Sequence, residues 1–143
     1  MKKNTLFALA TILFLVPSVF ASESPAEQEI KAALDRFGEG CQAELNSYCK
    51  DVTPGENRIL ACLYAFSDKL SPRCEMALYD SIGQLNRTVT NLAYTTHECD
   101  ADLTNNCSNI QPGEGRLLEC LKKNKTNVSK RCLDALKDVG WVK

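Results

Sequence analysis

The sequence of 143 residues carries 17 lysine and arginine residues against 18 aspartate and glutamate residues, a formal net charge of −1. Its longest basic block is the KKNK stretch at residues 122–125, and no basic stripe runs along any segment. Because nucleic-acid-binding domains usually carry such a stripe, the charge pattern excludes a nucleic-acid partner.

The first 21 residues have the three parts of a secretory signal peptide. A basic MKKN start precedes the apolar run TLFALATILFLVPSVF, and residues 19–21 end in the small-x-small pattern of a cleavage site. The apolar run is short for a transmembrane helix and is interrupted by Pro17. We therefore expect residues 1–21 to be removed after Ala21, as in a bacterial leader. The product would be periplasmic or secreted, with no membrane span after cleavage.

Residues 22–40 are predicted to form an N-terminal helix. Ser24 is a suitable N-cap, Pro25 fits the first helical position, and Glu27 completes a capping box. Gly38 is the expected stop. The apolar residues that recur at helical spacing are Ile30, Ala33, Leu34 and Phe37.

The cysteine spacing divides the rest of the chain into two copies of one unit. The gaps between successive cysteines are 8, 13 and 12 residues, then 25, then 8, 13 and 12 again. The copies are residues 41–80 and residues 99–140. An even number of cysteines in an exported chain is typical of a disulfide framework. The eight positions are Cys41, Cys49, Cys62, Cys74, Cys99, Cys107, Cys120 and Cys132.

Within each copy, two helix starts are predicted. The TPGE sequence at residues 53–56 and its counterpart QPGE at 111–114 are interpreted as an N-cap followed by the first helical turn. The glycine in each is attributed to a close approach of neighbouring backbone. A second helix should begin behind the N-cap residues Ser71 and Ser129.

The second helix of copy one is expected to continue as a connecting helix over residues 81–98, which joins the two copies. In copy two the matching helix ends sooner, near Gly140. The apolar stripe of the connecting helix contains Leu78, Ile82, Leu85, Val89 and Leu92. Its exposed polar face is predicted at Asn86, Arg87, Thr88, Thr90 and Asn91.

Four cysteines in a copy allow three pairings, and the spacing alone does not choose among them. Counting helical rise from the turn at residues 50–53 places Cys41, Cys62 and Cys74 at similar depth, with Cys49 near the turn. Pairing Cys41 with Cys62 would leave Cys49 far from Cys74. This favours a nested scheme, in which the expected pairs are Cys41–Cys74, Cys49–Cys62, Cys99–Cys132 and Cys107–Cys120.

The motif C-x7-C-x12-C-x11-C, with PGE-x-R before the third cysteine and S-x-R-C at the end, resembles a known family. It is similar to the cysteine-rich repeat of the Golgi apparatus glycoprotein, also called cysteine-rich fibroblast growth factor receptor and E-selectin ligand. The match covers residues 41–80 and 99–140, so the chain looks like a small bacterial two-repeat member. The resemblance implies an all-helical, disulfide-bonded fold.

The cysteine spacing and the single histidine bear on the function class. The alternative function is a cysteine-based metal-binding or storage protein, or a thiol-redox protein. Zinc sites favour C-x2-4-C pairs and thiol-redox chemistry favours C-x-x-C, and the sequence has neither. His97 is the single histidine, so we expect no Ser/His/Asp catalytic set and no cofactor or metal site. We expect a non-enzymatic binding or structural module with a protein or glycan partner. Arg58 and Arg116, repeated at the same position, are candidate surface or binding residues. A salt bridge to a neighbouring acid, or a side-chain stem packed over the disulfide, is the favoured role.

The sequence thus predicts an all-α protein in which two tandem disulfide-stapled helical cysteine-rich repeats are joined by a long helix. Each repeat of about 40 residues is too small to be stabilised by its apolar core alone, so the crosslinks are expected to supply much of its stability.

Overall fold

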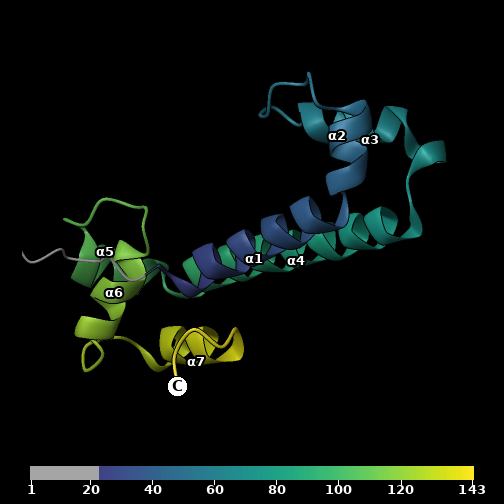
Figure 1. Ribbon diagram of the computed structural model, residues 1–143. Coiled ribbons are helices and arrows are strands. Elements are labelled where there is room, and N and C mark those ends of the chain that lie inside the picture. Colours follow the sequence, from purple (N-terminus) through teal and green to yellow (C-terminus); the bar gives the residue numbers. More distant parts are fainter. Residues whose placement is uncertain (1–22) are drawn as a thin grey trace, which may run out of the picture.

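The computed structural model describes residues 23–143, and the predicted signal peptide lies outside the described residues. Between residues 23 and 143 the chain contains helices and no strand, which confirms the all-α prediction (Figure 1). The helices are α1 (Pro25–Gly40), α2 (Gln42–Tyr48), α3 (Arg58–Ala65), the 3-10 helix η1 (Ser67–Lys69), α4 (Pro72–Glu98), α5 (Asp100–Cys107), α6 (Arg116–Lys123) and α7 (Lys130–Asp138). No helix within this part of the chain is long and apolar enough to cross a membrane.

Helix α1 begins as predicted. The Ser24 hydroxyl accepts a hydrogen bond from the Glu27 N–H, and the Glu27 carboxylate accepts one from the Ser24 N–H at 2.7 Å. This capping box satisfies two of the N–H groups that a helix start leaves without intrahelical partners. The helix runs past the predicted stop at Gly38 and ends at Gly40.

Helices α1 and α4 form a long antiparallel hairpin, with α2 and α3 at one end and α5 and α6 at the other (Figure 1). The Ser81 hydroxyl donates a hydrogen bond to the Ala33 carbonyl at 2.8 Å, and the Thr88 hydroxyl donates to the Glu29 carboxylate at 2.7 Å. The seam of the hairpin is therefore made of small side chains. Its buried members, seven residues apart on each helix, are Ala26 and Ala33 on α1 and Cys74, Ser81, Thr88 and Thr95 on α4.

Small residues let the two helix backbones approach closely. A Cβ atom added at Gly40 would lie 2.1 Å from the Ala77 Cβ, which is well inside van der Waals contact. The prediction that Thr88 lies on an exposed polar face is wrong, because Thr88 is fully buried in this seam. Its hydroxyl is tolerated there since two acceptors, the Glu29 carboxylate and the Gln84 carbonyl, lie within hydrogen-bond distance of its one O–H.

Each repeat has two nested crosslinks. The outer disulfide, Cys41–Cys74 or Cys99–Cys132, joins the end of an incoming helix to the start of the outgoing helix. The inner disulfide, Cys49–Cys62 or Cys107–Cys120, joins the two short helices between them. Helix α4 is the outgoing helix of the first repeat and the incoming helix of the second. These four bonds are the pairs of the nested scheme.

The predicted helix start at residues 53–56 is wrong, and so is its counterpart at 111–114. Helices α3 and α6 begin later, at Arg58 and Arg116. Gly55 and Gly113 adopt φ values of 113° and 110°, and the glutamate that follows each also has a positive φ. Such a run of positive φ cannot be helical, and it explains the repeated glycine without a close approach of backbone.

Each repeat surrounds its disulfides with a small core of its own. In the first repeat Leu63 is the one large apolar side chain that is fully buried with Cys41, Cys49 and Cys74. The core of the second repeat is larger and also takes in Ala26 from α1. Its buried apolar members besides the cysteines are Ala26, Leu121, Val128, Leu136 and Trp141.

Candidate binding cleft beside the second repeat

The start of α1 docks against a loop of the second repeat. Gly115 has a φ of 66°, and a Cβ atom added to it would lie 2.6 Å from the Ser24 Cβ. The equivalent residue of the first repeat, Asn57, has nearly the same φ of 61°. The left-handed conformation is thus common to both repeats, and the glycine at 115 is required by the contact with α1.

A cleft of about 330 Å³ opens between this contact, the last turns of α4 and helix α6. Three charged residues, Glu27, Glu114 and Arg116, also line it. The side chains of Glu114 and Arg116 are exposed, and we call this part of the cleft its mouth. Such a volume, with apolar walls and a few polar groups at the edge, is at the lower end of the range for small-molecule sites. The apolar side chains that line it include Leu92, Leu103, Leu117, Leu118, Leu121 and Trp141.

Trp141 lies at the wall of this cleft, three residues beyond the end of α7. Its side chain is 8% exposed, and its Nε1–H has no hydrogen-bond partner among the described residues. A buried indole usually finds an acceptor, since leaving the N–H unpaired costs about 1–3 kcal/mol. Trp141 is the single tryptophan of the chain. No sequence motif pointed to a role for it.

The two repeated arginines hold the loops that precede α3 and α6. Arg58 donates to the carbonyls of Thr53 and Pro54 and pairs with Glu56 at 2.6 Å. Arg116 makes the same three contacts, with Gln111, Pro112 and Glu114. These bonds hold the positive-φ loop in its conformation. They explain why an arginine is repeated at this position. The guanidinium of Arg116 also belongs to the cleft mouth, whereas Arg58 lies at the far end of the hairpin.

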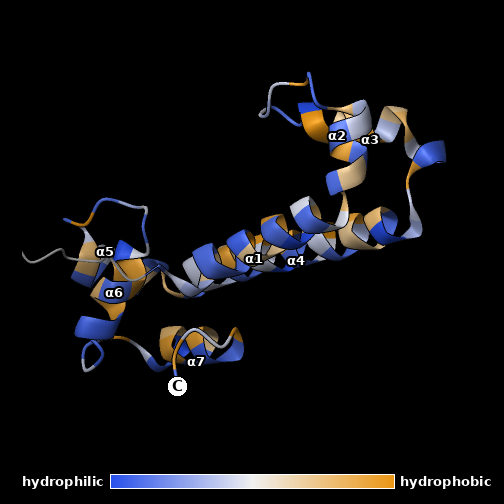
Figure 2. Ribbon diagram, viewed as in Figure 1, coloured by the Kyte–Doolittle hydropathy of each residue, from blue (hydrophilic) through white to orange (hydrophobic). Residues whose placement is uncertain are grey.

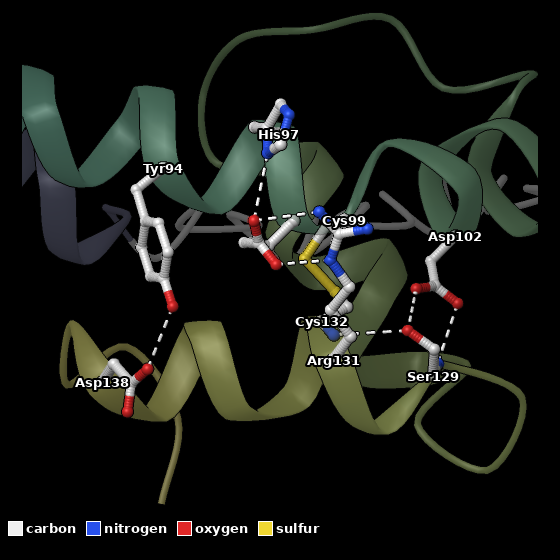
Figure 3. A network of polar contacts seen from close by, with 9 residues as sticks. Tyr94, His97, Cys99, Asp102, Ser129, Arg131, Cys132 and Asp138 are labelled. Atoms are coloured by element: carbon white, nitrogen blue, oxygen red, sulfur yellow. Dashed lines mark hydrogen bonds and ion pairs between the residues drawn. A yellow bond between two sulfur atoms is a disulfide. The ribbon is translucent and has the colours of Figure 1, made fainter.

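Polar contacts fasten α7, and with it Trp141, to α4 and α5 (Figure 3). The Tyr94 hydroxyl donates to the Asp138 carboxylate at 3.0 Å, and Arg131 forms a two-point ion pair with Glu98. Hydrogen bonds from Arg131, and then from His97, lower the pKa of Glu98 from its usual 4.5 to about 2. The hydrogen bond to Asp138 in turn raises the pKa of Tyr94.

A buried acid supports the start of the outgoing helix in both repeats, and sequence reasoning missed it. Asp102 accepts hydrogen bonds from the backbone N–H and the hydroxyl of Ser129. Glu44 occupies the equivalent place and accepts one from the Ser71 N–H at 3.0 Å. Hydrogen bonding from the Ser71 side chain and backbone lowers the pKa of Glu44. The signal was an acid three residues after the first cysteine of each copy.

All eight cysteine sulfurs are in disulfides, so none offers a thiolate to a metal or to a redox reaction in this structure. Among residues 23–143, no three histidine, cysteine, aspartate or glutamate side chains are grouped so that they could hold a metal ion. His97 lies exposed on the last turn of α4, with its Nδ1 atom 3.0 Å from the Glu98 carboxylate.

Comparisons with known proteins find the same repeat. A family profile described as "Cysteine rich repeat" matches residues 94–129. Golgi apparatus protein 1 from Rattus norvegicus is 47% identical over 34 residues, and so is that from Mus musculus. The match covers 24% of this chain and 3% of each relative. No solved structure is significantly similar to the chain. Residues 94–129 are therefore similar to the cysteine-rich repeat, and the chain spans only a small part of the length of these relatives.

Proposed function

We propose that this chain is an exported, non-enzymatic binding module, and that the cleft beside the second repeat is its binding site. Export is supported by the leader-like residues 1–21 and by four disulfides, which persist in oxidising compartments. The similarity to a Golgi protein is in line with such a compartment. Recovery of the product from the periplasmic fraction or from the culture medium shows whether it stays in the periplasm or leaves the cell.

The observation that carries the binding role is the apolar cleft of about 330 Å³. Its walls come from elements that the crosslinks and the polar network hold in place, so the cavity exists before a ligand arrives. Preformed sites lose little conformational entropy on binding. We infer that the cleft receives an apolar group of roughly the size of two fused aromatic rings, with any polar part of the ligand at the Glu114 and Arg116 mouth.

The single tryptophan gives this proposal a direct test. The oxidised chain without residues 1–21 is titrated with the neutral apolar dye N-phenyl-1-naphthylamine while Trp141 fluorescence is recorded. We expect Trp141 emission to fall as dye emission rises, because energy transfers between groups in one cleft. Thr96 is exposed at the cleft, so Thr96→Phe fills part of the cavity and is expected to weaken dye binding at least about tenfold.

Thr90→Phe is the matched control, since Thr90 is exposed on the same helix and does not line the cleft. It should bind the dye as the unmodified chain does. Equal dye affinities for Thr96→Phe and the unmodified chain would contradict the cleft as binding site, and so would a titration that leaves Trp141 emission unchanged.

Export is tested separately. When the full chain is produced in a bacterium, we expect the mature protein to begin at Ser22, as found by N-terminal sequencing. Its intact mass should be lower than that of the reduced chain by eight hydrogens, two for each of the four disulfides. A cytoplasmic product that retains Met1 would contradict the proposal.

A further inference from the structure

The α1–α4 hairpin has an apolar face that lies beside its buried seam. We use the term apolar face for the large aliphatic and aromatic side chains next to the seam. Hydrophobic residues alternate with hydrophilic ones along both helices of the hairpin (Figure 2). The members of the apolar face are Ile30, Leu34 and Phe37 on α1, and Leu78, Ile82, Leu85, Val89 and Leu92 on α4.

These residues project to one side of the hairpin. Successive residues of a helix are turned by about 100° around its axis. Measured in that sense of rotation, the members on α1 point roughly 40–100° away from the seam residue Ala33. The members on α4 are rotated by roughly 20–100° from Ser81, in the same sense. Because the two helices are antiparallel, equal rotations in the chain direction point to the same side of the pair. The two stripes therefore form one continuous surface.

The described chain leaves the middle of this surface uncovered. Leu34 is 54% exposed, Ile82 is 41% exposed and Val89 is 61% exposed. A hairpin of two helices is a single layer, and a stable helical domain buries its apolar stripes against a second layer. The second repeat covers only one end of the face, where Ile30 and Leu92 meet the cleft.

The charge pattern favours a second copy of this chain as the cover. Between Ser81 and Thr96, α4 carries a single charged side chain, Arg87, which lies on the opposite side from the apolar face. In an isologous interface a surface meets itself, so any net charge on it would meet the same charge. On α1 the charged side chains nearest to the apolar members, Glu27 and Lys31, have opposite charges and lie at the edge of the face. The face therefore carries no net charge that a second copy would repel, and a partner of one charge sign would find no excess of the opposite sign.

The area of the apolar face is adequate for self-association of modest strength. The stripe on α4 is about 21 Å long and the helix pair is about 20 Å wide, which gives a projected area of roughly 400 Å². Two such faces with a polar rim approach the roughly 1,000 Å² total that separates biological interfaces from incidental ones. A dimer of this size is expected to exchange with monomer at micromolar concentrations.

We propose that two copies of the chain pack through their apolar faces, so that two α1–α4 hairpins form the two layers of a symmetric four-helix bundle. This inference does not depend on the cleft as a ligand site. Substitutions at Ile30 and Leu92, which belong to both, are not needed for its test.

The test is sedimentation velocity on the oxidised chain without residues 1–21, from about 1 to 200 µM. We expect a concentration-dependent shift from monomer to dimer. Ile82→Glu and, on the other helix, Leu34→Glu should each raise the dissociation constant at least about 30-fold, because each places an unpaired charge in the interface. Both side chains are partly exposed in the monomer, so the fold should persist, as shown by circular dichroism and four intact disulfides.

Met76→Glu is the matched control. Met76 is an exposed apolar residue of α4, 67% exposed, that lies away from the apolar face. It should leave the dissociation constant unchanged. The proposal is overturned if the unmodified chain stays monomeric at 200 µM. It is equally overturned if a dimer forms that Ile82→Glu and Leu34→Glu do not weaken, or that Met76→Glu weakens as much as they do.

Discussion

Asp102 on α5 holds Ser129 at the start of α7 with two hydrogen bonds, one from the backbone N–H at 2.8 Å and one from the hydroxyl at 2.6 Å. The same hydroxyl accepts a hydrogen bond from the Cys132 N–H. One carboxylate therefore fixes a residue that caps a helix and precedes the outer disulfide. In the first repeat Glu44 holds Ser71 in a comparable way.

Replacing Asp102 with alanine should destabilise the fold by about 1–3 kcal/mol, because the N–H and hydroxyl of Ser129 lose their acceptor at a largely buried position. Urea denaturation with all disulfides intact measures this free energy of unfolding. Asn105→Ala, at an exposed position of the same helix, is the control and should change it by no more than about 0.5 kcal/mol. Equal effects of both substitutions would mean that the carboxylate contributes little.

The close packing of the hairpin predicts opposite effects for two glycines of α1. Gly40→Ala should cost about 1–3 kcal/mol, because the new methyl group would meet the Ala77 Cβ at 2.1 Å. Gly38→Ala should stabilise by about 0.5–1 kcal/mol, since no atom lies within 4 Å and alanine favours the helix. Thermal unfolding of the two variants compares them. If the clash is the cause, adding Ala77→Gly to Gly40→Ala should recover most of the loss.

The nested crosslinks should contribute unequally to stability. Loop-closure entropy gives about 4 kcal/mol for the outer bond Cys99–Cys132, with a separation of 33 residues, and about 3 kcal/mol for the inner bond Cys107–Cys120, with a separation of 13. Each cysteine pair is replaced with two alanines, and the free energy of unfolding in urea is measured. We expect the loss to be larger for the outer pair than for the inner pair. A larger loss for the inner pair would indicate that packing around the sulfurs outweighs the effect on the unfolded chain.

Acid should weaken the attachment of α7 through Glu98. The pKa of Glu98 in the folded chain is about 2, below the usual 4.5, so its ion pair with Arg131 stabilises the fold above pH 4.5. That contribution is lost as the pH falls from about 4.5 towards 2. Glu98→Gln should therefore flatten the pH dependence of the unfolding temperature in this range.

Carboxyl chemical shifts measured by NMR during an acid titration check the cause. Arg131→Met should return the pKa of Glu98 towards 4.5, because the main hydrogen-bond donor is removed. Glu39→Gln, at an exposed position of α1, is the control for the loss of one carboxylate and should leave the acid response of the unfolding temperature as it is. An unshifted Glu98 in the unmodified chain would contradict the ion pair.

Much of the fold could be predicted because it depends on local signals. The N-cap residues Ser24, Ser71 and Ser129 each cap a helix as expected, since a side chain and the next three residues suffice to form the cap. The repeated cysteine gaps identified two copies, and the number of residues between cysteines limits which sulfurs can meet. Two local signals were wrong: Gly38 did not end α1, and the residues of the PGE loop, which fit a helix start, form a positive-φ turn.

The candidate cleft was beyond sequence reasoning because its walls come from segments that are far apart in the chain. Trp141, Leu118 and Leu92 come together only after α6 has packed on α5 and α7 on α4. Arg116 was identified as repeated, but its repeat reflects the loop that it holds in both copies. Its place at the cleft mouth follows from the docking of α1 on the second repeat.

The sequence by itself determined the helical class, the duplication and the presence of enough cysteines for four disulfides. These features depend on capping residues, apolar periodicity and cysteine spacing, which can be read from short stretches of the chain. Only the tertiary structure decided which face of α4 is buried. Apolar periodicity pointed to the stripe from Leu78 to Leu92, yet the seam is lined by Ser81, Thr88 and Thr95. Small residues lie there because the two helices pack closely. The distance between the helix axes depends on the side chains of both helices, so it is not set by the sequence of either helix alone.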